Sequence, residues 1–93
     1  MSTLMRARAE VRGVVQGVGF RYFVLGEARQ RGLTGFTRNR PDGTVDVLVE
    51  GESGLVEEFL SCLRIGPPAS RVSALQVERQ PHTGEFATFE VRH

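Results

Sequence analysis

The sequence predicts an α+β fold in which two helices pack on one face of an antiparallel β-sheet. Segments in which apolar and polar residues alternate, a pattern typical of half-buried strands, recur along the chain. Two segments with apolar residues at helical spacing lie between them. The chain has 93 residues, which suffices for one compact core, so we expect a single domain over residues 1–93.

The first third of the chain is expected to form a strand and then a helix. From Met5 to Arg12, apolar residues alternate with arginine and glutamate, which predicts a strand. A loop with three glycines, residues 13–19, follows it. From Arg21 to about Gly32 the apolar residues recur at helical spacing, and the glycine is a typical helix end.

The middle of the chain is expected to form a hairpin and a second helix. Strands over about 34–40 and 45–50 flank Pro41-Asp42-Gly43, a strong turn sequence. After Gly51 an apolar stripe at helical spacing predicts a helix that Ser53 caps and two prolines stop.

The last part is expected to form a strand over about 72–79 and a short strand around Phe89. The element order is therefore strand-helix-strand-strand-helix-strand, with an extra short strand near the end. Two strand-helix-strand units with right-handed crossovers place both helices on the same face of the sheet. This architecture is the ferredoxin-like α/β sandwich.

The composition excludes several kinds of chemistry. All 12 basic residues are arginine, so no lysine is available for a Schiff base or a P-loop. One cysteine and two histidines supply neither a disulfide nor a zinc cluster, and we expect no metal and no cofactor. The net charge of +1 argues against nucleic acid as a partner. The sequence has no apolar run of membrane length and no secretory signal, so we expect a cytoplasmic protein without a membrane partner.

The first candidate site is the loop Gly13-Val-Val-Gln-Gly-Val-Gly-Phe-Arg21, which lies between the first strand and the first helix. Closely spaced glycines let backbone N–H groups point inward, and a helix start adds unpaired N–H groups. Arg21 can meet an oxyanion with two parallel hydrogen bonds. The loop is neither a Walker motif nor a dinucleotide fingerprint, whose third glycine would fall on Tyr22. The alternative interpretation is a tight turn in which Arg21 caps a surface carboxylate.

The second candidate is Asn39, the only asparagine of the chain, just before the predicted turn. An asparagine beside a turn usually serves backbone hydrogen bonding. The predicted topology, however, allows Asn39 to face the loop before Arg21. Its amide is both a donor and an acceptor, so it can hold a water molecule in a chosen orientation.

Together these segments resemble the paired signature of the acylphosphatase family. The resemblance lies in Gly13-x-Val-Gln-Gly-Val-Gly-Phe-Arg21 and in Gly32-Leu-x-Gly-Phe-x-Arg-Asn39-x-x-Asp-Gly43. The following Val-x-Val-x-Val-Glu-Gly segment also matches, and the similarity is strongest from Val11 to Gly51. Many members carry tryptophan where this chain has Phe36, a position that we expect in the core.

The resemblance implies an enzyme that hydrolyses acyl phosphates to a carboxylate and inorganic phosphate, without a metal or a covalent intermediate. Arg21 and the amides of the phosphate-binding loop would hold the phosphoryl group, and Asn39 would position the attacking water. The loop residues concerned are Gln16, Gly17, Val18, Gly19 and Phe20. The partner would be a small-molecule acyl phosphate, and we expect a monomer.

Elementary chemistry agrees with such a site. The leaving carboxylate has a conjugate acid with a pKa near ~4, so it needs no general acid. Catalysis then consists of charge stabilisation and in-line placement of water.

Two alternatives stay open at this point. One is a carbamoyl-phosphate-handling domain of a hydrogenase-maturation protein, and the other is a non-catalytic ferredoxin-like module that binds a ligand. RNA binding is disfavoured, because Gly35-Phe36-Thr37-Arg38-Asn39 lacks the RNP1 order of aromatic residues.

The remaining reactive side chains have structural interpretations. Cys62 is expected as a core thiol of the second helix, with Glu57 and Glu58 on its wet face. His82 and His93 are expected to be solvated. The phenylalanines expected in the core are Phe20, Phe23, Phe36, Phe59 and Phe89.

Overall fold

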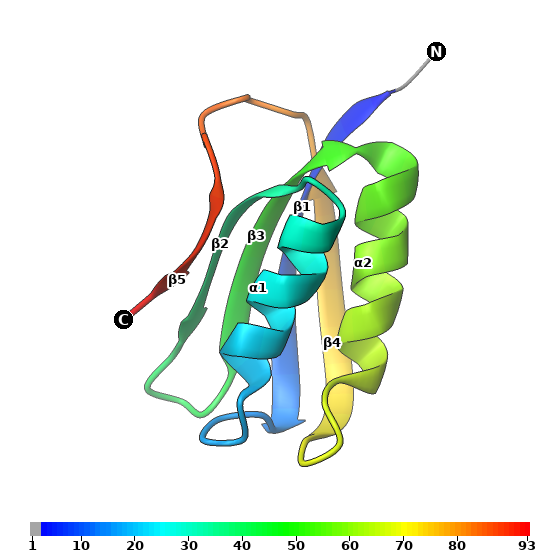
Figure 1. Cartoon of the computed structure of the whole chain (residues 1–93). Coiled ribbons are helices and arrows are strands. Elements are labelled where there is room, and N and C mark those ends of the chain that lie inside the picture. The colour runs from blue at the N-terminus through cyan, green and yellow to red at the C-terminus, as the bar shows by residue number, and fades with distance from the viewer. Residues whose placement is uncertain (1–2) are drawn as a thin grey trace.

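The computed structural model describes residues 3–93 and has two helices on one face of a five-stranded sheet (Figure 1). The elements are β1 (Leu4–Val14), α1 (Phe20–Gln30), β2 (Thr34–Asn39), β3 (Val45–Glu52), α2 (Ser53–Ile65), β4 (Arg71–Gln80) and β5 (Phe89–Arg92). The strand order is β4-β1-β3-β2-β5. The predicted ferredoxin-like α/β sandwich is therefore confirmed.

One strand pairing differs from the predicted antiparallel sheet. β5 pairs with β2 in a parallel register that sets Gly35 opposite Phe89, whereas the other neighbouring strands are antiparallel. Residues 81–88 carry the chain from β4 to the far edge of the sheet, so that β5 runs in the direction of β2 (Figure 1). β5 thereby covers the backbone edge that β2 would otherwise expose.

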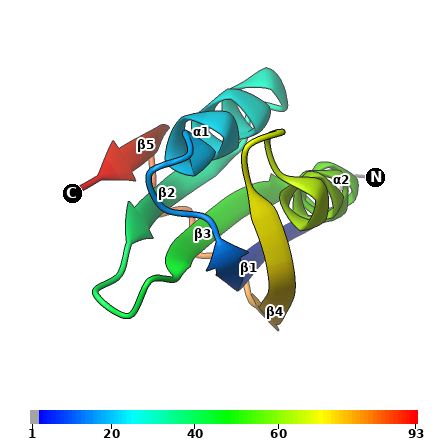
Figure 2. The ribbon, with the colours of Figure 1, turned by 90° about the horizontal axis from the view of Figure 1, so that it is seen from below.

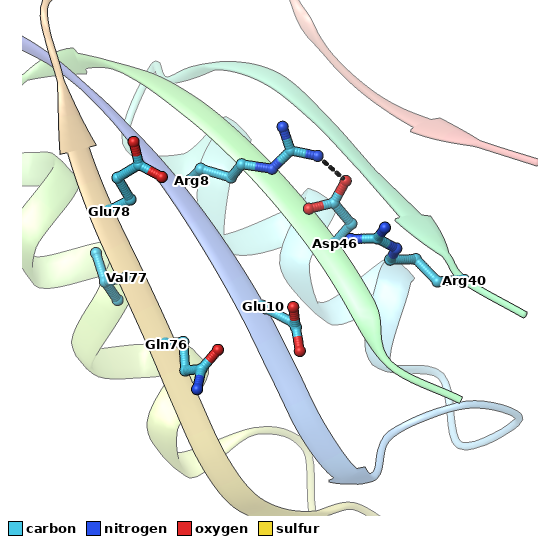
Figure 3. Close-up of a pocket in the computed structure, with 7 residues that line it drawn as sticks. All are labelled: Arg8, Glu10, Arg40, Asp46, Gln76, Val77 and Glu78. Atoms are coloured by element: carbon cyan, nitrogen blue, oxygen red, sulfur yellow. Dashed lines mark hydrogen bonds and ion pairs between the residues drawn. The ribbon is translucent and has the colours of Figure 1, made fainter. Parts of the chain in front are cut away.

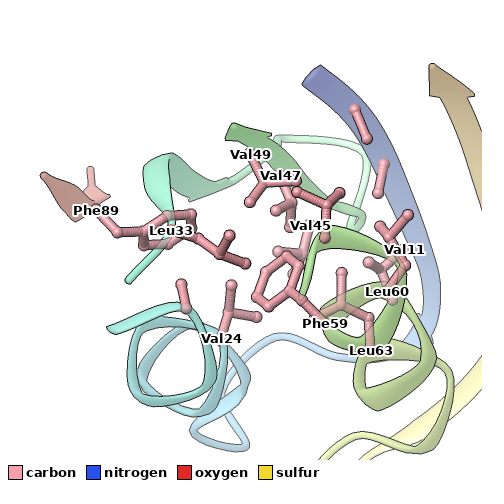
Figure 4. Packing of buried hydrophobic residues seen from close by; sticks show 14 of the residues in the cluster. Val11, Val24, Leu33, Val45, Val47, Val49, Phe59, Leu60, Leu63 and Phe89 are labelled. Atoms are coloured by element: carbon pink, nitrogen blue, oxygen red, sulfur yellow. The ribbon is translucent and has the colours of Figure 1, made fainter. Parts of the chain in front are cut away.

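The core lies between the helices and the sheet. Figure 2 shows both helices on the same side, and Figure 4 shows side chains from the two layers meeting there. Phe59 of α2 is fully buried and meets Phe89 of β5 edge to face, with ring centroids 6.1 Å apart. Burying a ring of this size stabilises the fold by about 1.5–3 kcal/mol. Val24 and Ala28 bring the buried stripe of α1 to the same core.

Phe36 is buried, as expected, but it lies outside the cluster between the helices and the sheet. Gly35 and Thr37 alternate with it along β2, which turns the Phe36 ring to the face of the sheet that the helices leave open. There the ring meets Phe86 and lies under the guanidinium of Arg92, 4.0 Å from its centroid. The ring is nonetheless buried, because the segment after β4 crosses this face.

The cap of α2 also differs from the expectation. The side chain of Glu52, rather than Ser53, accepts hydrogen bonds from the backbone N–H groups of Gly54 and Leu55 at 3.0 and 3.1 Å. The carboxylate offers two acceptor oxygens to two unpaired N–H groups, which one hydroxyl cannot match.

The expected wet face of α2 carries ion pairs. Glu57 pairs with Arg79 of β4 at 2.6 Å, and Glu58 lies 3.4 Å from Arg31. Cys62 is half-buried, and Arg31 donates to its Sγ at 3.4 Å.

Glu50 is a fully buried carboxylate that holds the β4–β5 segment on the open face. It accepts hydrogen bonds from the backbone N–H groups of Thr83 and Gly84, both at 2.9 Å, and Arg6 lies 3.2 Å away. His82, expected to be solvated, has its Nε2 only 3.6 Å from Glu50 and a side chain 28% exposed. Burial raises the pKa of Glu50, but the hydrogen bonds from Thr83, Gly84 and Arg6 outweigh it and hold the pKa below its ordinary value.

We predict that Glu50→Gln lowers the free energy of unfolding by about 2–4 kcal/mol at pH 7, because buried donors lose a charged acceptor. The Glu50 contribution is complete above the ordinary carboxyl pKa of about 4.3 and is lost as the pH falls through the lower folded-state pKa. The difference between wild type and variant should therefore shrink in acid. Urea denaturation at several pH values measures it.

Glu90→Gln is the matched control, because Glu90 is exposed on β5 and, within the described residues, pairs only with the exposed Arg92. Its effect should stay within about 0.5 kcal/mol. Equal stability of the Glu50 and Glu90 variants would contradict the role assigned to Glu50.

Candidate functional site

The sequence-predicted site residues meet in a hollow of about 180 Å³ where α1 begins and β2 ends. Arg21 and Asn39 both line it, together with part of the glycine loop. The full lining is Val15, Gly17, Gly19, Phe20, Arg21, Tyr22 and Asn39. β3 separates β1 from β2 in the sheet, and the loop bridges this distance as it runs from β1 to α1 (Figure 2).

The loop conformation requires glycine at two of its positions. Gly17 and Gly19 have φ values of 73° and 75°, in the left-handed region that other residues rarely adopt. Gly19 is the residue before α1, and no side chain of residues 3–93 caps the helix there. The first turn of α1 also contains no acidic residue. Its unpaired N–H groups and partial positive charge are therefore available to an anion.

Gln16 fixes the loop to the turn between β2 and β3. Its Nε2 donates to the carbonyl oxygens of Arg40 at 2.8 Å and of Thr44 at 2.9 Å. The side chain of Gln16 is thus used for positioning and adds nothing to the lining of the hollow. Val18 also lies outside the lining, because its side chain packs against the core.

Arg21 is held at its outer side by the last two residues of the chain. Its Nη1 donates to the carbonyl oxygen of Arg92 at 3.2 Å and lies 3.4 Å from Nδ1 of His93. His93, expected to be solvated, is therefore a neighbour of the site. Within residues 3–93, Arg21 takes part in no ion pair, which disfavours the alternative that it caps a surface carboxylate.

Asn39 presents an unused acceptor. It lies at the end of β2, and its Oδ1 is buried without a hydrogen-bond partner among residues 3–93. Leaving a buried acceptor unpaired costs about 1–3 kcal/mol, so such an atom is expected to gain a partner such as a water molecule or a ligand. The backbone role usual for an asparagine beside a turn does not engage this atom.

Tyr22 is a lining residue that the sequence analysis did not assign to the site. Its side chain is 66% exposed at the rim of the hollow. The signal in the sequence was an aromatic residue directly after Arg21 in the first helical turn.

A second hollow, of about 290 Å³, lies on the open face of the sheet and is lined by charged side chains of β1, β3 and β4 (Figure 3). Within the hollow Arg8 pairs with the buried Asp46 at 3.0 Å, and Arg38, which lies outside the lining, is 3.4 Å from the same carboxylate. This hollow is on the opposite side of the sheet from the helices. Among residues 3–93, no three His, Cys, Asp or Glu side chains gather where they could hold a metal ion. No helix of the described part is long and apolar enough to cross a membrane.

Comparison with known proteins identifies the family. A sequence model of the family described as acylphosphatase matches residues 7–91. The chain belongs to the acylphosphatase family. It is 53% identical over 93 residues to an acylphosphatase of Aeropyrum pernix, covering 98% of this chain and 91% of that protein. It resembles the crystal structure of acylphosphatase from Bacillus subtilis with a TM-score of 0.92 and 37% identity, covering 98% of this chain and 100% of that one.

These findings confirm the expected enzyme class, acylphosphatase, and favour it over a non-catalytic binding module. Part of full-length HypF, solved in a phosphate- and nucleotide-bound form, also resembles the chain, with a TM-score of 0.86. The identity there is 27%, and the match covers 12% of that protein. The acylphosphatases are therefore the more similar of the two groups.

Proposed function

We propose that this acylphosphatase holds the phosphoryl group of its substrate with the loop amides of residues 16–20 and with Arg21, and orients the attacking water with Asn39. The observation that carries the proposal is that Arg21, Asn39 and the glycine loop line one hollow. The guanidinium of Arg21, the amide of Asn39 and the backbone N–H groups of the loop therefore border the same space. The first turn of α1, which no side chain of residues 3–93 caps, begins there.

The phosphoryl group carries its negative charge on oxygens that accept hydrogen bonds. Backbone N–H groups at a helix start and an arginine fork are suited to these oxygens in geometry and in charge. The loop amides are fixed before the substrate arrives, because Gln16 anchors the loop, and the folded helix places the backbone of Arg21 beside them. Preorganised donors of this kind stabilise the charge of the transition state without reorganising during the reaction.

The chemical step needs one water molecule. The water oxygen attacks phosphorus, the bond between phosphorus and the acyl oxygen breaks, and its electron pair leaves with the carboxylate. A proton of the water ends on a phosphate oxygen. Asn39 lines the hollow, and its Oδ1, which is buried and has no hydrogen-bond partner among residues 3–93, can accept a hydrogen bond from this water once the side chain rotates to expose it. This bond would aim the lone pair of the water at phosphorus. Since the transition state is loose, this placement and the surrounding charge supply the catalysis.

Arg21 must exchange partners when the substrate binds. In the structure it donates to the neutral carbonyl of Arg92 at 3.2 Å. A phosphate oxygen carries negative charge and attracts the guanidinium electrostatically in addition to accepting its hydrogen bond, whereas the carbonyl is neutral. The phosphoryl group is therefore expected to compete successfully for part of the guanidinium, while Arg92 limits how far the side chain swings.

We predict that Arg21→Ala lowers kcat/KM for benzoyl phosphate by more than about 100-fold, since more than ~3 kcal/mol of transition-state stabilisation is lost. The variant should keep its fold, because the polar contacts of Arg21 are exposed. Arg29→Ala is the matched control: it removes the same charge from an exposed position of α1, away from the hollow. If Arg21→Ala hydrolyses benzoyl phosphate as well as Arg29→Ala does, the proposed phosphate site is wrong.

We predict that Asn39→Ala lowers kcat by about 100-fold or more, the effect of losing a group that positions a reacting atom. The inhibition constant of inorganic phosphate should stay within about twofold of wild type, because Asn39 is assigned to the water and not to the phosphoryl group. Steady-state kinetics with phosphate as inhibitor separates the two roles. A parallel loss of turnover and phosphate binding in a folded variant would assign Asn39 to phosphate binding instead.

A further inference from the structure

We propose that Tyr22 binds the acyl group of the substrate and gives this enzyme a preference for aromatic over small aliphatic acyl phosphates. The inference rests on the proposed function, because it needs the phosphoryl group to lie between the glycine loop and Arg21. It assigns a specificity-determining role to a residue outside the phosphate site and the water site.

The exposure of Tyr22 has no structural explanation in the chain. Its side chain is 66% exposed, whereas the other aromatic residues of 3–93 are buried or half-buried. Its neighbours on α1, Phe20 and Phe23, pack toward the core with ring centroids 6.0 Å apart. Within the described residues, Tyr22 belongs to no such ring pair, and no hydrogen bond engages its hydroxyl. An exposed tyrosine ring beside a pocket is a typical binding element, since it offers a large apolar surface with little entropy to lose.

The in-line geometry of the reaction leaves Tyr22 available to the acyl group. In an in-line reaction the leaving oxygen lies opposite the attacking water. With the water held by Asn39, the acyl group lies on the opposite side of the phosphoryl group from Asn39. Tyr22 lines the same hollow, is 66% exposed and follows Arg21 directly in the sequence, so its ring can contact an acyl group that leaves the phosphate site.

The side chains at the rim of the hollow favour substrates with an aromatic acyl group. Tyr22 presents a ring, and Arg21 presents a guanidinium that is already assigned to the phosphoryl group. An aromatic acyl group can stack on the ring or meet it edge to face, whereas an acetyl group offers only a methyl. A contact between two aromatic rings corresponds to about a 3- to 10-fold gain in affinity.

The test compares benzoyl phosphate with acetyl phosphate in wild type, Tyr22→Ala and Tyr22→Phe. In Tyr22→Ala the KM for benzoyl phosphate should rise about 3- to 10-fold, while the KM for acetyl phosphate changes less than twofold. Tyr22→Phe should restore the wild-type ratio, because the ring and not the hydroxyl makes the contact. Ile65→Ala, which shortens an exposed apolar side chain at the end of α2, is the control and should leave the ratio unchanged.

The inhibition constant of inorganic phosphate tests the proposed phosphate site separately from the role of Tyr22. Competitive inhibition that is equal in wild type and Tyr22→Ala supports the phosphate site and restricts Tyr22 to the acyl group. A wild-type enzyme that phosphate does not inhibit competitively would overturn the proposed function and this inference with it. Normal phosphate inhibition with an unchanged ratio of the two KM values in Tyr22→Ala would overturn the role of Tyr22 alone.

Discussion

The two hydrogen bonds that Gln16 donates to the turn between β2 and β3 are the interaction on which the site depends. They run from one amide nitrogen to the carbonyl oxygens of Arg40 and Thr44, at 2.8 and 2.9 Å. Through them the end of β1 is fixed next to the end of β2, although β3 lies between these strands. The loop is thereby anchored by a side chain, which leaves its backbone N–H groups free for an anion. The sharp direction changes at Gly17 and Gly19 complete the cradle.

The two faces of the sheet are connected through the C-terminal part of the chain. On the open face, Glu50 binds the backbone at Thr83 and Gly84 and so fixes the segment that leads to β5. β5 then pairs with β2 and ends at Arg92, whose carbonyl accepts from Arg21. The buried carboxylate of Glu50 on the open face thus supports β5, and β5 carries the carbonyl that accepts from Arg21. β5 also contributes to the small core, because its Phe89 is one of the buried rings.

The order of the elements follows from local sequence patterns, because apolar periodicity and turn residues are local properties. The proximity of Asn39 to the loop follows from topology, which the element order already restricts. Other features depend on contacts distant in sequence. Phe36 is buried on the open face because residues 81–88 cross that face, and His93 approaches Arg21 because β5 pairs with β2 in parallel. The parallel pairing of β5 with β2 has no local signal in the sequence, because a short edge strand has the same pattern of residues whether it pairs parallel or antiparallel.

Neither the sequence pattern nor the fold assigns a role to an individual site residue, because a residue that lines the hollow need not bind the substrate. The central claim is that the loop amides bind the phosphoryl group. The most direct measurement is a titration of ¹⁵N-labelled protein with inorganic phosphate, followed by amide chemical shifts. We expect saturable shifts that are largest at Gly17, Gly19 and Phe20, with a smaller effect around the open-face hollow near Arg8. Largest shifts at that hollow, with the loop amides unmoved, would contradict the account.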